Sequence, residues 1–165
     1  KISQMKRADQ IPNKIFELSA AIRLVAQWRV KGKTIAFTNG VFDLLHEGHI
    51  YSLSQAAAEA DYLIVGINSD ASTKRLKGES RPIHNEKSRA IILASLVMVD
   101  AVIIFEEDTP FNLINQLLPD VLVKGGDYTL EQIVGANEVM ANGGRIVINK
   151  MVEGFSTTGI IDKLK

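Results

Sequence analysis

Two of the three histidines in this 165-residue chain stand three positions apart, in the segment TNGVFDLLHEGH over residues 38–49. Imidazole groups can bind a metal, exchange protons or donate hydrogen bonds, so this pair is the first candidate for chemistry. A zinc site is disfavoured, because zinc is held by four ligands or by three and a water. His46 and His49 supply only two, and the chain has no cysteine. The pair could also have no functional role, which is the favoured interpretation of the third histidine, His84.

The local pattern favours a phosphate site. Asn39 and Gly40 follow a strand-like run, residues 34–38, and a helix is predicted to begin near Glu47. Histidines at positions i and i+3 around a helix start lie on one face, beside backbone amides that lack intrahelical partners. Gly48 leaves space for a ligand to approach the backbone. Because a helix N-terminus attracts anions, two imidazole donors beside it predict phosphate binding.

The remaining chain alternates strand-like and helical segments. Buried strands are predicted at residues 34–38, 62–67, 101–105, 121–123 and 145–149. Helices are predicted from Asn13 to about residue 30, and at residues 50–60, 85–97, 110–118, 130–141 and 157–164. Strands without polar alternation indicate a mostly parallel sheet covered on both faces. The fold class is therefore α/β, a doubly wound sheet with ligands expected at the carboxyl ends of its strands.

Unusual polar residues gather at those predicted strand ends, in residues 39–49, 68–84, 124–128 and 153–158. Strand ends of a parallel sheet meet at one edge, so these segments predict a single site. We expect a helical extension over residues 1–33 and one globular domain over residues 34–165. The extension could pack on the core or form the interface of a homodimer.

Composition excludes several classes. Nineteen basic and nineteen acidic residues give a net charge of zero, which does not favour a nucleic-acid partner. The most apolar run, residues 90–99, is too short to span a membrane, and the polar N-terminus does not resemble a signal peptide. A cytoplasmic location is expected.

The segment His46-Glu47-Gly48-His49 resembles the His-x-Gly-His signature of the nucleotidyltransferase superfamily, which includes cytidylyltransferases and small adenylyltransferases. Gly40-Val41-Phe42-Asp43 matches the usual lead-in to that signature. Further segments are similar to the family at RLKGESRPI (residues 75–83), VLVKGGDY (residues 121–128) and VEGFSTT (residues 152–158). The resemblance implies an enzyme with the Rossmann-like nucleotidyltransferase fold.

These segments look closest to the D-glycero-β-D-manno-heptose 1-phosphate adenylyltransferases, the ADP-heptose synthase domains of lipopolysaccharide precursor synthesis. That branch implies ATP and a sugar 1-phosphate as substrates, with ADP-heptose and pyrophosphate as products. Glycerol-3-phosphate cytidylyltransferases carry Arg-Thr where this chain has Met151-Val152, which disfavours that alternative. An FMN adenylyltransferase and a non-catalytic nucleotide sensor stay open. Many relatives fuse this domain behind a sugar kinase, which nothing here resembles, so the kinase would be a separate protein or a removed part.

A phosphate oxygen is the implied nucleophile, so the reaction needs alignment and charge stabilisation and no general base. His46 and His49 would donate to phosphates, Lys77 would bridge the reacting phosphates, and Ser156 would hold the leaving ones. The expected catalytic residues are therefore His46, His49, Lys77 and Ser156. The expected nucleotide- and phosphate-binding residues are Asn39, Gly40, Phe42, Gly48, Arg75, Arg89, Gly125, Asp127, Ser156, Thr157 and Thr158.

Some roles stay open. Arg75 is the second candidate for the bridging role, and Arg89 could instead be a solvated helix residue paired with Glu86. Asp127 could equally cap the following turn, and for Asp43 a structural role is favoured over orienting His46. Mg²⁺ is expected to be held mainly by the phosphates of ATP, with no metal ligands from the protein.

Overall fold

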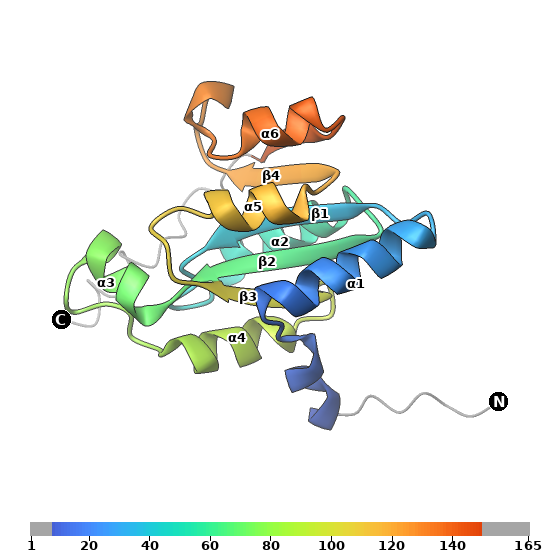
Figure 1. Cartoon of the computed structure of the whole chain (residues 1–165). Coiled ribbons are helices and arrows are strands. Elements are labelled where there is room, and N and C mark those ends of the chain that lie inside the picture. The colour runs from blue at the N-terminus through green and yellow to red at the C-terminus, as the bar shows by residue number, and fades with distance from the viewer. Residues whose placement is uncertain (1–7, 150–165) are drawn as a thin grey trace.

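Five parallel strands form the centre of the computed structural model, which describes residues 8–149 (Figure 1). The strands are β1 (Ile35–Gly40), β2 (Tyr62–Asn68), β3 (Ala101–Phe105), β4 (Val121–Gly125) and β5 (Arg145–Asn149). Their order is β3-β2-β1-β4-β5, and every neighbouring pair is parallel. The chain therefore builds outward from β1 on one side and then resumes on the other side with β4. The predicted doubly wound sheet is confirmed, with its switch point between β1 and β4.

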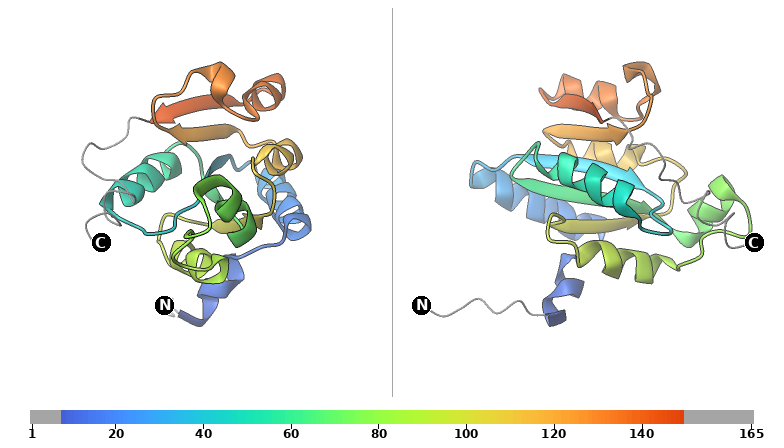
Figure 2. Two further views of the ribbon diagram at one scale, coloured as in Figure 1. Left: turned by 90° about the vertical axis from the view of Figure 1, so that its left-hand side faces the viewer. Right: turned by 180° about the vertical axis from the view of Figure 1, so that it is seen from behind.

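Helices cover both faces of the sheet (Figures 1 and 2). One face carries α1 (Leu18–Val30), α5 (Phe111–Leu117) and α6 (Ala136–Ala141), and the other carries α2 (Glu47–Ala57) and α4 (Glu86–Ala94). Successive strand residues point to opposite faces, so Phe37 packs in the first core cluster and Ala36 in the second. Burial on both faces explains why the strands are continuously apolar. Within residues 8–149, no helix combines the length and apolar character that crossing a bilayer requires.

The N-terminal part of the described chain packs onto this core. A 3-10 helix, η1 (Ala8–Lys14), precedes α1, so the predicted first helix is present but begins at Leu18, and its predicted start at Asn13 is wrong. Between them the chain runs beside β3, where Ile15 forms a bridge with Val102 and the Phe16 amide donates to the Val102 carbonyl. In α1, Trp28 is buried and stacks on Tyr62 with ring centres 4.1 Å apart. The domain boundary at residue 33 stays a prediction.

Two further helical segments differ from the prediction. The helix expected over residues 130–141 is divided into η2 (Leu130–Gln132) and α6. Gly135 separates them with a φ of +82°, and a Cβ there would lie 2.6 Å from Ile114. Residues 68–84, expected as a polar strand end, include the helix α3 (Asp70–Lys77), which is capped by the Ser69 side chain accepting from the Ser72 amide. The helix expected over residues 157–164 lies outside the described residues.

Candidate functional site

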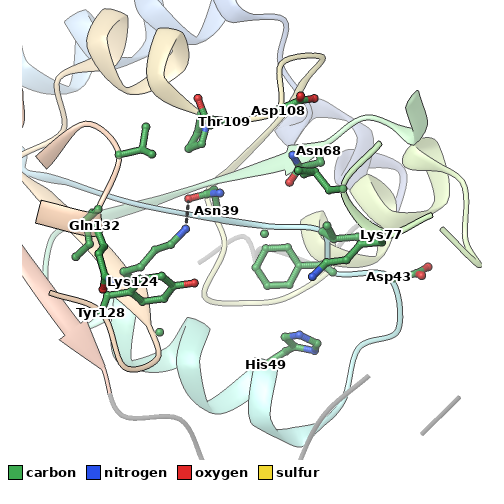
Figure 3. A pocket seen from close by; sticks show the side chains of 18 of the residues that line it. Asn39, Asp43, His49, Asn68, Lys77, Asp108, Thr109, Lys124, Tyr128 and Gln132 are labelled. Carbon is green, nitrogen blue, oxygen red and sulfur yellow. Dashed lines mark hydrogen bonds between the residues drawn. The ribbon is translucent and has the colours of Figure 1, made fainter. Parts of the chain in front are cut away.

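A cavity of about 530 Å³ opens at the carboxyl ends of β1 and β4 (Figure 3). This is the switch point, where neighbouring connections leave in opposite directions and a crevice forms. Polar side chains from separate elements surround it: His49 from α2, Lys77 from α3 and Lys124 from β4. A concave site with several cationic and amide donors suits an anionic ligand such as a phosphate.

The two histidines lie together at the start of α2. His46 is the N-cap residue, which confirms the predicted helix start near Glu47. The two rings stack with centres 3.8 Å apart and planes 28° apart. The His46 backbone amide donates to Nδ1 of His49 over 3.4 Å. Since Nδ1 of His49 accepts, its proton sits on Nε2, which makes Nε2–H the available donor.

Both imidazoles are neutral near pH 7. Burial, with the charge of the adjacent His46 as a smaller cause, lowers the pKa of His49 to about 4. Burial also lowers the pKa of His46. A bound anion would raise both pKa values, because it favours the charged imidazolium form. The pair is therefore suited to respond to phosphate by strengthening its hydrogen bonds.

Phe42 and Gly40 shape the cavity beside His49. The Phe42 backbone has a φ of +49°, which is unusual for a bulky residue and turns the chain sharply after β1. Its ring meets the His49 ring edge-on at 5.3 Å between centres. A Cβ on Gly40 would lie 3.0 Å from the Phe42 ring, so a larger residue there would require this ring to shift by a few tenths of an ångström.

Asp43 connects the turn after β1 to residues 81–84, on another side of the cavity. Its buried carboxylate accepts hydrogen bonds from Arg81 Nε and from the backbone amides of Ile83 and His84, the latter two at 2.6 and 3.0 Å. Arg81 also lines the cavity. These contacts agree with the structural role favoured for Asp43. Only the backbone amide of His84 takes part, and its side chain is exposed.

Arg89 ties the ends of β1 and β2 together. Its side chain is 0% exposed and forms an ion pair with Asp70 at 2.8 Å. It also donates to three backbone carbonyl groups, at distances of 2.8 to 2.9 Å, those of Val41, Asn68 and His84. The alternative of a solvated residue paired with Glu86 is wrong, because Glu86 accepts from the Asp70 amide. A phosphate contact by Arg89 stays a prediction, although four of its five N–H groups are already engaged.

The basic residues of α3 divide between two environments. Lys77, at the end of the helix, lines the cavity (Figure 3). Arg75 is exposed, pairs with Asp108 at 2.7 Å and donates to the Glu106 carbonyl at 2.6 Å. Of the two candidates for the bridging role, Lys77 is thus the one placed at the cavity.

Lys124, on β4, is the cavity cation that the sequence did not single out. Its Nζ donates to Oδ1 of Asn39 across 3.0 Å and lies 5.8 Å from the ring centre of Tyr128 (Figure 3). Burial lowers its pKa. The sequence signal that could have identified it is a lysine inside an apolar strand, next to Gly125. A charged side chain at such a position needs a ligand or a polar neighbour to compensate for its burial.

The predicted site residues fall into three groups. Those that line the cavity are Asn39, Gly40, Phe42, His49, Lys77 and Gly125. Those that do not line it are His46, Gly48, Arg75, Arg89 and Asp127. Ser156, Thr157 and Thr158 lie outside the described residues. Polar lining residues that the sequence did not identify include Lys124, Asn68, Thr109, Tyr128 and Gln132.

Fold and site together define an α/β protein of the nucleotide-binding kind, with a cation-lined crevice at its switch point. A family model described as cytidylyltransferase-like matches residues 37–163, and the chain belongs to this family. Membership confirms the predicted nucleotidyltransferase class of enzyme.

Several bacterial proteins called bifunctional protein HldE are similar to most of this chain. The HldE of Rhodospirillum rubrum is 55% identical over 92% of the chain, and that of Mesorhizobium japonicum is 52% identical over 92%. The matches cover 31% and 30% of those two proteins. The chain therefore spans about a third of the length of these relatives.

Solved structures agree on the fold. A lipopolysaccharide core biosynthesis protein from Thermoplasma volcanium superposes with a TM-score of 0.59 at 29% identity, over 73% of this chain and 98% of that one. A pantoate-beta-alanine ligase from Francisella tularensis gives a TM-score of 0.58 at 16% identity, over 89% of this chain and 75% of that one. The second likeness concerns the fold alone. The predicted Rossmann-like nucleotidyltransferase fold is confirmed.

Proposed function

We propose that this chain is an adenylyltransferase that joins ATP and D-glycero-β-D-manno-heptose 1-phosphate into ADP-heptose and pyrophosphate. An oxygen of the sugar phosphate attacks the α-phosphorus of ATP, and the bond from that phosphorus to the α,β-bridging oxygen breaks. The electron pair of that bond leaves with pyrophosphate. The observation that carries the chemistry is the meeting of His49, Lys77 and Lys124 around one cavity at the switch point. The choice of substrate is supported by the HldE relatives and by the lipopolysaccharide protein of similar fold.

The geometry supports a reaction driven by positioning. The attacking phosphate is already ionised near neutral pH, so the site needs donors for the charge that builds on the α-phosphate and on pyrophosphate. We assign this task to the Nε2–H group of His49 and to the ammonium group of Lys77. His46 stacks on His49 and completes the donor pair at the start of α2. Ser156 and Thr157 are proposed to hold the leaving phosphates.

Mg²⁺ fits this site as an ion carried by the nucleotide. Among residues 8–149, no group of three or more histidine, aspartate or glutamate side chains is placed to hold a metal. The cavity carboxylates are already engaged, Asp43 by Arg81 and Asp108 by Arg75. The phosphates of ATP would therefore supply most ligands, with water. The ion would neutralise charge on the departing phosphates.

The acceptor must come from a reaction that phosphorylates a sugar. The relatives are described as bifunctional and are about three times as long as the matched region. We propose that a sugar kinase, as a separate protein or as another part of a longer chain, supplies the sugar 1-phosphate. A cytoplasmic location, where ATP is available, and a homodimer stay predictions.

A panel of pyrophosphate-release assays tests the proposal. ATP and CTP are each combined with heptose 1-phosphate, glycerol 3-phosphate and FMN in the presence of Mg²⁺. Release is expected to be fastest with ATP and the β-configured heptose 1-phosphate, and EDTA should abolish it. Faster turnover of CTP with glycerol 3-phosphate, or of ATP with FMN, would replace the proposed substrates. Binding of ATP without release for any pair would instead indicate a nucleotide sensor.

A further inference from the structure

We infer that Lys124 is a further catalytic residue, whose ammonium group binds a phosphate oxygen of the substrates at the switch point. The inference deepens the proposed function, because it assigns a substrate contact on the β4 side of the same cavity. It concerns a residue that the family signature around His46 and His49 does not include. Two observations support it, the place of Lys124 in the fold and the charge around it.

Lys124 lies at the crevice between β1 and β4. These two strands pair at residues 36–37 with 121–122, and Lys124 and Asn39 lie further along, where the strands approach their carboxyl ends. In Figure 3 the Lys124 side chain extends toward the cavity and meets Asn39, with Lys77 on the opposite wall. Because Lys124 sits on a strand of the sheet, its backbone is held more rigidly than that of a loop residue. A phosphate lying over the crevice would be within the reach of this group.

The charge around Lys124 distinguishes it from the arginines nearby. Arg75, Arg81 and Arg89 each form an ion pair with an aspartate, Asp108, Asp43 and Asp70 respectively. Among the described residues, no carboxylate lies within ion-pair distance of Lys124, and its hydrogen-bond partner is the neutral amide of Asn39. An ammonium group has three donors, so two remain for a ligand. A half-buried cation without a counter-ion is costly for folding, which suggests that an anion completes the site.

A purely structural role is the alternative, with Lys124 serving to join β4 to β1 through Asn39. One such hydrogen bond contributes only about 1 kcal/mol. Burial lowers the pKa of Lys124, which means that folding disfavours its charged form. The two roles therefore predict opposite signs for the effect on stability when the charge is removed. A structural lysine would leave the fold weaker, whereas a substrate-binding lysine would leave it unchanged or more stable.

The test compares Lys124→Met with Lys87→Met, a matched change of an exposed lysine on α4 outside the cavity. Without ligand, Lys124→Met should melt at or above the wild-type temperature. The kcat/KM for pyrophosphate release should fall about 100-fold or more, as for other lost transition-state donors. Pyrophosphate should raise the melting temperature of the wild type and of Lys87→Met, and should raise that of Lys124→Met much less. Lys124→Arg, which keeps the charge, should retain part of this pyrophosphate response.

Two further measurements identify which phosphate is bound. Weaker binding of an α,β-methylene analogue of ATP by Lys124→Met would assign the contact to the nucleotide, and a raised KM for the acceptor would assign it to the sugar phosphate. A Lys124→Met protein that fails to fold, melts well below the wild type or keeps normal turnover would overturn the inference. The pyrophosphate response needs no acceptor, so it can succeed or fail independently of the identity of the sugar.

Discussion

The two walls of the cavity are built in different ways. On one wall, residues 39–49 run from β1 into α2, and their geometry depends on neighbours in the sequence: the N-cap at His46, the turn at Phe42 and the space over Gly40. On the other, distant groups hold the chain: the carboxylate of Asp43 accepts from amides of residues 81–84, and the guanidinium of Arg89 pairs with Asp70 at the start of α3. The first wall is a local motif, whereas the second depends on two buried charges. Removing a donor of the first wall should impair chemistry, whereas removing one of the two buried charges that hold the second wall should impair folding.

The largest effect on folding is expected from Arg89→Met. Three carbonyl groups would lose their donor, and each buried group left unpaired costs about 1–3 kcal/mol. We expect the free energy of unfolding to fall by about 3–5 kcal/mol, measured by urea denaturation. Arg75→Met removes an exposed ion pair of similar length and should cost less than about 1 kcal/mol. Equal losses for the two variants would contradict the assigned role of Arg89.

The largest effect on catalysis without loss of folding is expected from His46→Ala and His49→Ala. Each removes a donor that should strengthen as charge builds on phosphate, and such losses typically lower kcat by about 10²–10³. Binding of ATP, measured by calorimetry, should change by only a small factor. His84→Ala, at an exposed side chain, is the control and should behave as wild type. Normal turnover by both single variants would make the pair incidental.

How well a contact of the site could be predicted depends on whether its partners are close in the sequence. The helix start at Glu47 and the meeting of His46 and His49 depend on a few adjacent residues, so spacing was enough to predict them. The bond from Lys124 to Asn39 joins residues 85 positions apart, and it exists only because β4 returns beside β1. Strand order is set by packing of the whole chain, which no local pattern reveals.

Arg89 shows the same limit within a helix. Its sequence neighbours, with Glu86 one turn earlier, are typical of a solvated ion pair. The tertiary fold instead brings the ends of β1 and β2 against it and buries the guanidinium. The cap of α3 at Ser69, by contrast, is local, because a serine before Asp70 in a first turn is a typical helix start, so the sequence itself carries the signal for this helix.

A smaller effect should appear in the pH dependence of stability. The pKa of His49 is near 6.5 when unfolded and about 4 when folded, so between these values the unfolded chain binds more protons. Its contribution to stability is therefore fully present above about pH 6.5 and is lost as the pH falls toward 4. In His49→Gln the free energy of unfolding should fall less steeply across this window. Parallel pH profiles for the two proteins, measured by denaturation, would show that the folded-state pKa is not depressed.

The smallest effect on catalysis is expected from Arg75→Met, and it is best measured against a change of Lys77 in the same helix. Arg75 and Lys77 lie two residues apart in α3, but Lys77 lines the cavity and Arg75 pairs with Asp108 at the surface. Lys77→Met should lower kcat by far more than it weakens ATP binding, because a group that bridges the two reacting phosphates acts mainly in the transition state. Arg75→Met should keep kcat and ATP affinity within about twofold of wild type, since an exposed ion pair contributes only about 0–1 kcal/mol. Steady-state kinetics and calorimetry on both variants measure the difference. A large loss of ATP affinity in Arg75→Met would show that Arg75 leaves Asp108 to bind phosphate, as the resemblance to the family first implied.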